Sequence, residues 1–75
     1  MDEFEFKTED GSMAIGYILK ETGMTKSTGE AIRMIKQNAV KVDSEKVTDT
    51  KLALSSGKTY IVQVGKRKFA KVELM

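Results

Sequence analysis

The side chains of this sequence that could do chemistry are mostly cations. The chain has thirteen Lys and Arg residues but no His and no Cys. The absence of His and Cys excludes thiol nucleophiles, imidazole bases and nearly every zinc site. No two carboxylates have a spacing that converges on one helix face, and no glycine-rich phosphate loop follows a strand. We therefore expect no catalytic residue, no metal and no cofactor in this chain.

One group of basic residues surrounds a predicted helix that follows Ser27. Arg33 and Lys36 are three residues apart on that helix, and further cations precede and follow it. Lys and Arg neutralise nucleic-acid phosphates, and a helix N-terminus adds partial positive charge. The guanidinium of Arg33 suits bidentate phosphate contact, whereas a solvated surface is the alternative for the lysines. The candidate residues of this group are Lys26, Ser27, Arg33, Lys36, Lys41 and Lys46.

A second basic group is the triplet Lys66-Arg67-Lys68, which is followed by Phe69. Apolar residues alternate on both sides of the triplet. Pairing Val64 with Ala70 would place both apolar sets on one face and leave the triplet as a three-residue loop. An exposed Phe69 ring could then stack on an RNA base while the cations hold the strand. The alternative is that the ring folds back onto the sheet and the lysines only prevent edge aggregation.

Two short helices should position the first group. Ile15, Ile18 and Leu19 have helical spacing and predict a helix over residues 13–22, with Ser12 as its N-cap. Ser27 and Glu30 have the spacing of a capping box and mark the start of the second helix. Its predicted apolar face consists of Ala31, Ile32 and Ile35.

Strands should account for most of the remaining chain. The apolar period changes to two at Val40-Lys41-Val42, which precedes a turn at Asp43-Ser44-Glu45. Alternation over 4–8 predicts a short strand or an ordered arm, and the last third of the chain predicts a hairpin. We predict an α+β fold in which two helices form a hairpin or corner against a small, mostly antiparallel sheet.

The charge is unevenly distributed along the sequence. Residues 1–11 carry five carboxylates against Lys7 alone, a net charge of −4, whereas residues 12–75 carry twelve cations against six carboxylates, a net charge of +6. A basic body of this size suits a polyanion. We expect an acidic arm or short strand over 1–11 and one RNA-binding domain over 12–75. No apolar run approaches the ~18 residues of a membrane span, so we expect a soluble, cytoplasmic protein with no membrane contact.

Residues 25–47 resemble the S-four-type RNA-binding domain, whose αL motif runs Ser, basic, any, Glu, Ala, two basics, Leu, Ile, basic, Gln, Gly, then Val-x-Val-Asn-Gly. Thr28 and Ile32 replace usual basic residues of this pattern, and Asn38 replaces the usual Gly. The matching positions are Ser27, Glu30, Ala31, Arg33, Ile35, Lys36, Gln37, Val40 and Val42.

The form most similar to this chain is the C-terminal domain of bacterial tyrosyl-tRNA synthetases. The resemblance implies that the chain grips tyrosine tRNA and contributes no aminoacylation chemistry. It also implies a separate catalytic domain in the same parent protein, a homodimeric parent enzyme and a monomeric isolated domain. Two alternatives stay open: a stand-alone ribosome- or RNA-associated protein of the same fold, and a protein-interaction module whose basic face docks an acidic partner.

Overall fold

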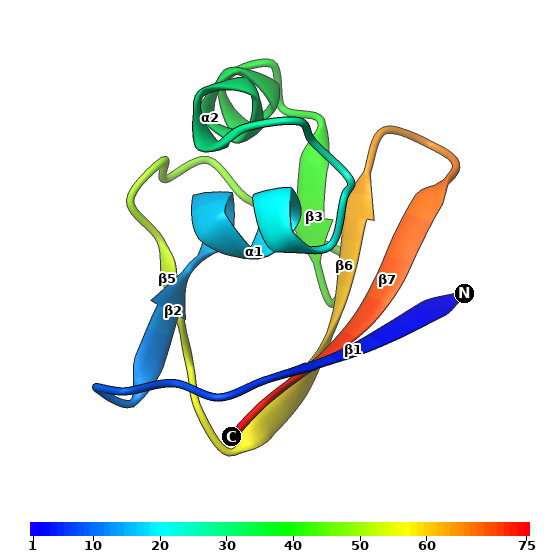
Figure 1. Ribbon diagram of the computed structural model, residues 1–75. Coiled ribbons are helices and arrows are strands. Elements are labelled where there is room, and N and C mark those ends of the chain that lie inside the picture. The colour runs from blue at the N-terminus through cyan, green and yellow to red at the C-terminus, as the bar shows by residue number, and fades with distance from the viewer.

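The computed structural model describes residues 1–75 and consists of two short helices and two sheets (Figure 1). The main sheet has five strands in the order β1-β7-β6-β3-β4, and a smaller sheet pairs β2 with β5. All pairings are antiparallel except that of β1 with β7. The elements in chain order are β1 Asp2–Phe6, β2 Ser12–Ala14, α1 Ile15–Glu21, α2 Thr28–Lys36, β3 Val40–Val42, β4 Glu45–Lys46, β5 Ala53–Ser55, β6 Lys58–Val64 and β7 Lys68–Leu74. The predicted α+β fold with a mostly antiparallel sheet is confirmed.

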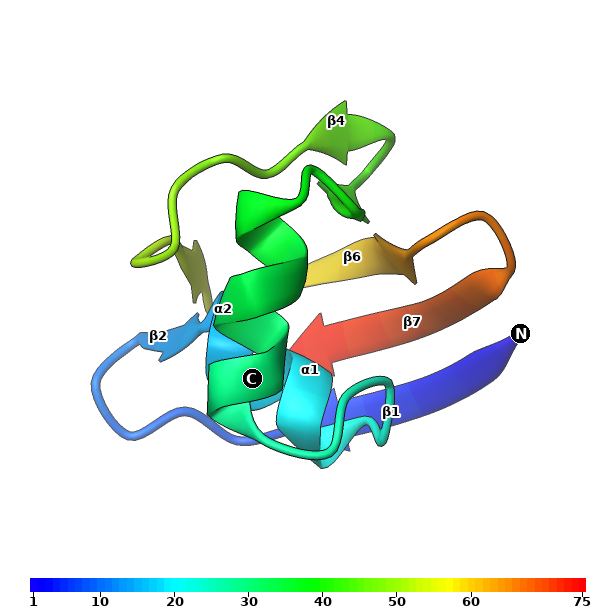
Figure 2. The same cartoon turned by 90° about the horizontal axis from the view of Figure 1, so that it is seen from above.

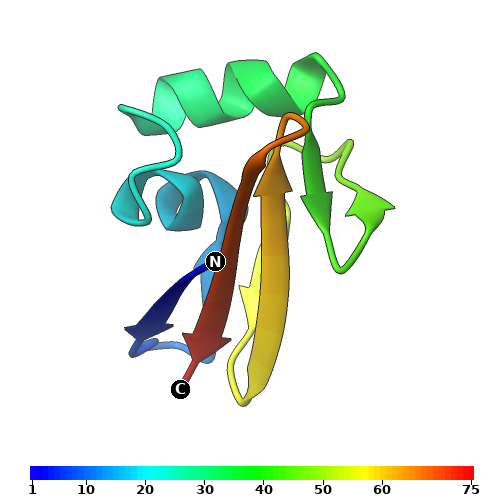
Figure 3. The same ribbon diagram turned by 90° about the vertical axis from the view of Figure 1, so that its right-hand side faces the viewer.

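Both helices lie on the same side of the five-stranded sheet (Figures 1 and 2). In Figure 3, α2 crosses the end of the sheet at which the β6–β7 turn lies, and α1 lies beneath it. The two helices meet at Gly16, where a Cβ atom would lie 3.9 Å from the Cβ of Ala31, an ordinary van der Waals distance. Neither helix is long and apolar enough to cross a membrane.

The core lies between the helices and the inner face of the sheet. Ile15, Ile18 and Leu19 of α1 are fully buried there, and burial of each such side chain contributes about 1.5–3 kcal/mol. The strands contribute alternate residues, as a half-buried sheet requires. These strand residues are Val40, Tyr60, Val62, Val64, Ala70, Val72 and Leu74.

The first helix is shorter than predicted, because it begins at Ile15 and follows a strand. Ser12 is not its N-cap: Ser12 pairs with Ser55 in β2–β5, and the capping position is Ala14, which has no side-chain cap. Pairing with β5 gives residues 12–14 backbone partners and places Met13 opposite Leu54. A partner about forty residues away in the sequence therefore overrides the local helix signal.

The second helix begins as predicted at a capping box. Ser27 Oγ accepts a hydrogen bond from the Glu30 N–H at 3.1 Å, and Glu30 Oε1 accepts one from the Lys26 N–H at 3.2 Å. The predicted apolar face is wrong at Ile32, which is 36% exposed, whereas Met34 packs against the core. The buried face of the helix is centred on Ala31 and Ile35. Ile32 lies about 100° around the helix axis from Ala31 and is therefore outside that face.

The β6–β7 hairpin has a register two residues away from the predicted one. Val62 pairs with Ala70, and Val64 pairs with Lys68, so the turn consists of Gly65, Lys66 and Arg67. The apolar residues still share one face, because a shift of two residues preserves the side-chain alternation of a strand. Gly65 has a backbone φ of +67°, a conformation that favours glycine. The turn therefore begins at Gly65 and ends before Lys68.

The β3–β4 hairpin closes through a two-residue turn at Asp43 and Ser44. Both residues have positive φ, 51° and 71°, as this class of tight turn requires. Asp43 Oδ1 accepts a hydrogen bond from the Ile61 N–H at 2.9 Å, which anchors the turn to β6. The short hairpin therefore has a fixed register on the sheet.

Candidate nucleic-acid interface

One flank of α2 meets the turn of the β6–β7 hairpin. Glu30 and Met34, one helical turn apart, line an open cleft of about 370 Å³ together with Lys66, Arg67 and Lys68. The Gly65 N–H donates to the Ala39 carbonyl oxygen at 2.7 Å, which ties the turn to the residues that follow the helix. We call residues 65–68 the hairpin tip. Residues separated by about thirty positions are thus held at one end of the molecule.

Arg33 and Lys36 are both exposed, and they lie about 60° apart around the axis of α2. At 100° per residue, Arg33 lies beside the row of Glu30 and Met34 that faces the hairpin tip. Lys36 shares a row with Ile32, farther round the helix. The structure therefore brings Arg33 nearer to the hairpin tip than Lys36.

Lys26 and Ser27 lie at the N-terminus of α2, and both are exposed. Ser27 Oγ already accepts the Glu30 N–H, so its hydroxyl hydrogen remains available as a donor. The preceding Met24 lines the same cleft as the hairpin tip. The helix start and the hairpin tip are consequently neighbours.

Lys41, Lys46 and Phe69 lie on the outer face of the sheet, opposite the helices. Lys41 is paired with Lys46 across β3–β4 and with Gln63 across β3–β6, and Gln63 is paired with Phe69 across β6–β7. Directly paired residues project to the same face. We call Lys46, Lys41, Gln63 and Phe69 the outer-face row. Sequence reasoning missed Gln63, which only the strand register reveals.

The predicted site cations have no acidic partners. Only two ion pairs form in the chain: Lys20 with Glu21 at 3.6 Å, and Lys71 with Glu3 at 3.9 Å. The cations of α2, of the hairpin tip and of the outer-face row therefore have no carboxylate within 4.0 Å. Unpaired surface cations are free to contact phosphates.

The acidic residues gather on the β1 side of the sheet. Glu3, Glu5 and Glu73 lie together on the outer face around Lys71. β1 is the edge strand opposite β4, so Glu3 and Glu5 are three strands away from Lys41, and Glu73 on β7 is two strands away. Asp2 and Glu30 are exceptions, because Asp2 lines a cleft with Arg67 and Phe69, and Glu30 lines the cleft of the hairpin tip. The fold separates the cluster of Glu3, Glu5 and Glu73 from the hairpin tip and from Lys41.

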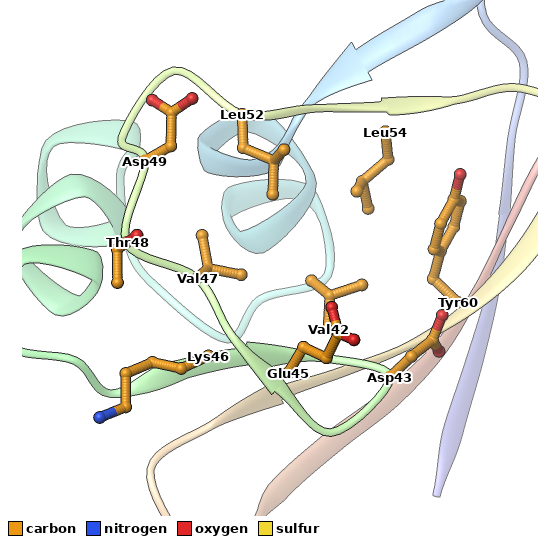
Figure 4. A pocket seen from close by; sticks show the side chains of 10 residues that line it. All are labelled: Val42, Asp43, Glu45, Lys46, Val47, Thr48, Asp49, Leu52, Leu54 and Tyr60. Atoms are coloured by element: carbon orange, nitrogen blue, oxygen red, sulfur yellow. The ribbon is translucent and has the colours of Figure 1, made fainter.

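A further cavity of about 480 Å³ lies between the β3–β4 hairpin and the segment that leads to β5 (Figure 4). Leu52, Leu54 and Tyr60 line it, and Lys46 points away from it. Asp43 and Glu45 also line this cavity. These carboxylates would repel a phosphate, so the cavity does not suit a nucleic-acid backbone. No group of three or more His, Cys, Asp or Glu residues could hold a metal ion.

Comparison with known proteins identifies one family. The family model of the tyrosine–tRNA ligase SYY-like C-terminal domain matches residues 1–72. A tyrosine–tRNA ligase of Colwellia psychrerythraea is 54% identical over 72 residues, which are 96% of this chain and 18% of that protein. A tyrosine–tRNA ligase of Coxiella burnetii is 47% identical over 75 residues, 100% of this chain and 19% of that protein.

A third relative, tyrosine–tRNA ligase 2 of Vibrio cholerae, is 53% identical over 74 residues, 99% of this chain and 18% of that protein. The chain thus spans less than a fifth of the length of these relatives.

Proposed function

Because this chain belongs to the tyrosine–tRNA ligase SYY-like C-terminal domain family, we propose that it binds tyrosine tRNA as part of a longer ligase. The observation that carries the proposal is that α2, which bears the unpaired Arg33 and Lys36, lines one cleft with the unpaired cations of the hairpin tip. Cations at such a surface contact phosphates and fix the orientation of an RNA without reading its bases.

The residues proposed to contact the RNA come from three places. Those of α2 and its N-terminus hold the backbone, the hairpin tip holds a second stretch of backbone, and the outer-face row adds contacts on the other face of the sheet. They are Lys26, Ser27, Arg33, Lys36, Lys41, Lys46, Lys66, Arg67, Lys68 and Phe69.

We further propose that this chain takes no part in the chemistry of aminoacylation. It has no His or Cys, and no group in it is arranged to bind the phosphates of ATP or to stabilise acyl transfer. The rest of the parent ligase, a homodimer in this proposal, would supply that chemistry in the cytoplasm. The purified chain should then give no tyrosine-dependent pyrophosphate exchange, and exchange above background would contradict this part of the proposal.

RNA binding itself is tested by titrating the chain with tyrosine tRNA, with a different tRNA, and with an acidic protein whose net charge equals that of the tRNA. The proposal predicts salt-dependent binding to tRNA and no comparable binding to the acidic protein. Equal retention of the acidic protein would favour a protein-interaction module instead. Equal affinity for both tRNAs would favour a general RNA-associated protein of the same fold.

A further inference from the structure

The two lysines of the outer-face row lie directly opposite each other across β3–β4. The Val47 N–H donates to the Val40 carbonyl at 2.9 Å, so Val40 and Val47 form a hydrogen-bonded pair. Hydrogen-bonded and non-hydrogen-bonded pairs alternate along an antiparallel ladder, which makes Lys41 and Lys46 a non-hydrogen-bonded pair with closely spaced side chains. Like charges directly opposite destabilise a sheet. An anion between the two ammonium groups would relieve this repulsion.

Phe69 lies at the other end of the outer-face row. Its side chain is 41% exposed, whereas its neighbour Ala70 is buried on the inner face. Neighbouring strands lie about 4.8 Å apart, so the row from Lys46 to Phe69 is about 14 Å long. An exposed aromatic ring on an open sheet face is the arrangement on which unpaired RNA bases stack.

Gln63 lies between the cations and the ring. Its Nε2 donates to the Gly65 carbonyl oxygen at 2.8 Å, which fixes the amide next to the hairpin tip. The amide oxygen of Gln63 remains available to accept a hydrogen bond from a base. The row therefore combines an anion position, a polar group and a stacking surface in one line.

We propose that the outer-face row binds an unpaired nucleotide of the RNA. Its base stacks on Phe69, and a phosphate farther along the same unpaired strand lies between Lys41 and Lys46. This inference rests on the proposed function, because it identifies which part of the RNA meets the sheet. In this inference, α2 and the hairpin tip contact the backbone of double-stranded RNA, and the opposite face of the sheet binds unpaired nucleotides.

The test compares single-stranded and duplex RNA in the 75-residue chain. The single strand is an oligoadenylate of about 12 nucleotides that carries one 2-aminopurine, whose fluorescence reports stacking, and the duplex has the same length. The variants are Phe69→Leu, which removes the ring, and Phe69→Tyr, which keeps it. Tyr17→Leu is the matched control, because Tyr17 is 43% exposed but belongs to α1.

Phe69→Leu should weaken single-strand binding about 5- to 150-fold, the effect of losing one stacked base, without changing the salt dependence. Phe69→Tyr should bind as the parent does, and the affinity of Phe69→Leu for the duplex should be unchanged. The double variant Lys41→Gln and Lys46→Gln should lower the salt slope for the single strand by up to about 0.7, because the two lysines hold one phosphate.

Equal losses in Phe69→Leu and Tyr17→Leu would overturn the inference, and so would equal losses for single strand and duplex. A Phe69→Leu variant that binds both RNAs as the parent does would also overturn it. The proposed function fails separately: it fails if replacing Lys66, Arg67 and Lys68 leaves tRNA binding and its salt dependence unchanged. Circular dichroism of each variant verifies that the fold is retained.

Discussion

The amide of Gly65 and the carbonyl of Ala39 form a 2.7 Å hydrogen bond that joins the β6–β7 turn to the residues after α2. This bond couples two basic segments that are far apart in the sequence. Arg33 precedes it on the helix side, and Lys66 and Arg67 follow it in the turn. The proposed RNA binding depends on this coupling, because cations on a mobile turn would lose conformational entropy when they bind RNA.

The first prediction concerns the cap of α2. Ser27→Ala removes the acceptor of the Glu30 N–H and should lower the free energy of unfolding by about 1 kcal/mol. Ser27→Asp keeps an acceptor and should restore most of that loss. Urea denaturation measures both values. Thr28→Ala is the control, which should change stability by less than about 0.5 kcal/mol; a loss as large as that of Ser27→Ala would mean that the cap is not the cause.

The second prediction concerns Lys46, which opposes Lys41 across the β3–β4 hairpin. Lys46→Glu replaces a repulsive pair with an attractive one, so it should stabilise the chain by about 0.2–1 kcal/mol and weaken RNA binding. For a domain of this size, about 1 kcal/mol raises Tm by roughly 4–8 °C. Thermal unfolding and RNA titration check the two effects.

The control for this charge reversal is Lys58→Glu, at the start of β6 opposite Leu74. It changes the net charge equally but lies at the far end of the strand from the hairpin tip. It should leave Tm nearly unchanged and weaken RNA binding less than Lys46→Glu. Greater stability in both variants would show that total charge, rather than the opposed lysines, is responsible.

The third prediction concerns the acidic residues of β1. Deleting this segment is not a clean test, because Phe4 and Phe6 pack against the core and β1 pairs with β7. Asp2→Asn with Glu3→Gln removes charge without removing the strand. RNA binding should tighten about two-fold at low salt, and the effect should vanish at high salt because charges are screened within roughly 8–10 Å.

The matched control is Glu9→Gln with Asp10→Asn, in the turn after β1. Asp2 lines a cleft with Arg67, whereas β1 runs away from the hairpin tip toward residue 9. The control should therefore tighten binding less. An equal effect of both double variants would indicate that the chain responds to net charge alone.

Local signals in the sequence predicted several features whose partners are close along the chain, although not the register of the β6–β7 hairpin. The cap between Ser27 and Glu30 is an example, because three residues separate its members. Pairings across long stretches could not be predicted. The strand at Ser12 depends on a partner at Ser55, and the parallel pairing of Asp2 with Ala70 joins opposite ends of the chain.

The candidate site divides in the same way. Residue types alone identified the cations of α2 and the hairpin tip as candidates. Their arrangement depends on register: the predicted pairing of Val64 with Ala70 placed Phe69 opposite Gly65, whereas Phe69 pairs with Gln63. The outer-face row could not be recognised without that pairing, since its members come from four strands.

The central claim is that α2 and the hairpin tip bind one RNA, and salt-dependent titration tests it most directly. Each lost phosphate contact lowers the slope of log affinity against log salt by up to about one unit. Arg33→Ala with Lys36→Ala should flatten the slope for tRNA by up to about two units, with the larger share from Arg33. Replacing Lys66, Arg67 and Lys68 by Ala should flatten it by up to about three units.

The control in this measurement is Lys20→Ala on α1, whose ammonium group lies 3.6 Å from Glu21 and 5.2 Å from the centre of the Tyr17 ring. For Lys20→Ala, the slope of log affinity against log salt should stay close to that of the parent chain. A loss of slope per charge in Lys20→Ala equal to that of the helix and hairpin variants would contradict the account, because it would mean that RNA responds to the overall charge and not to this surface.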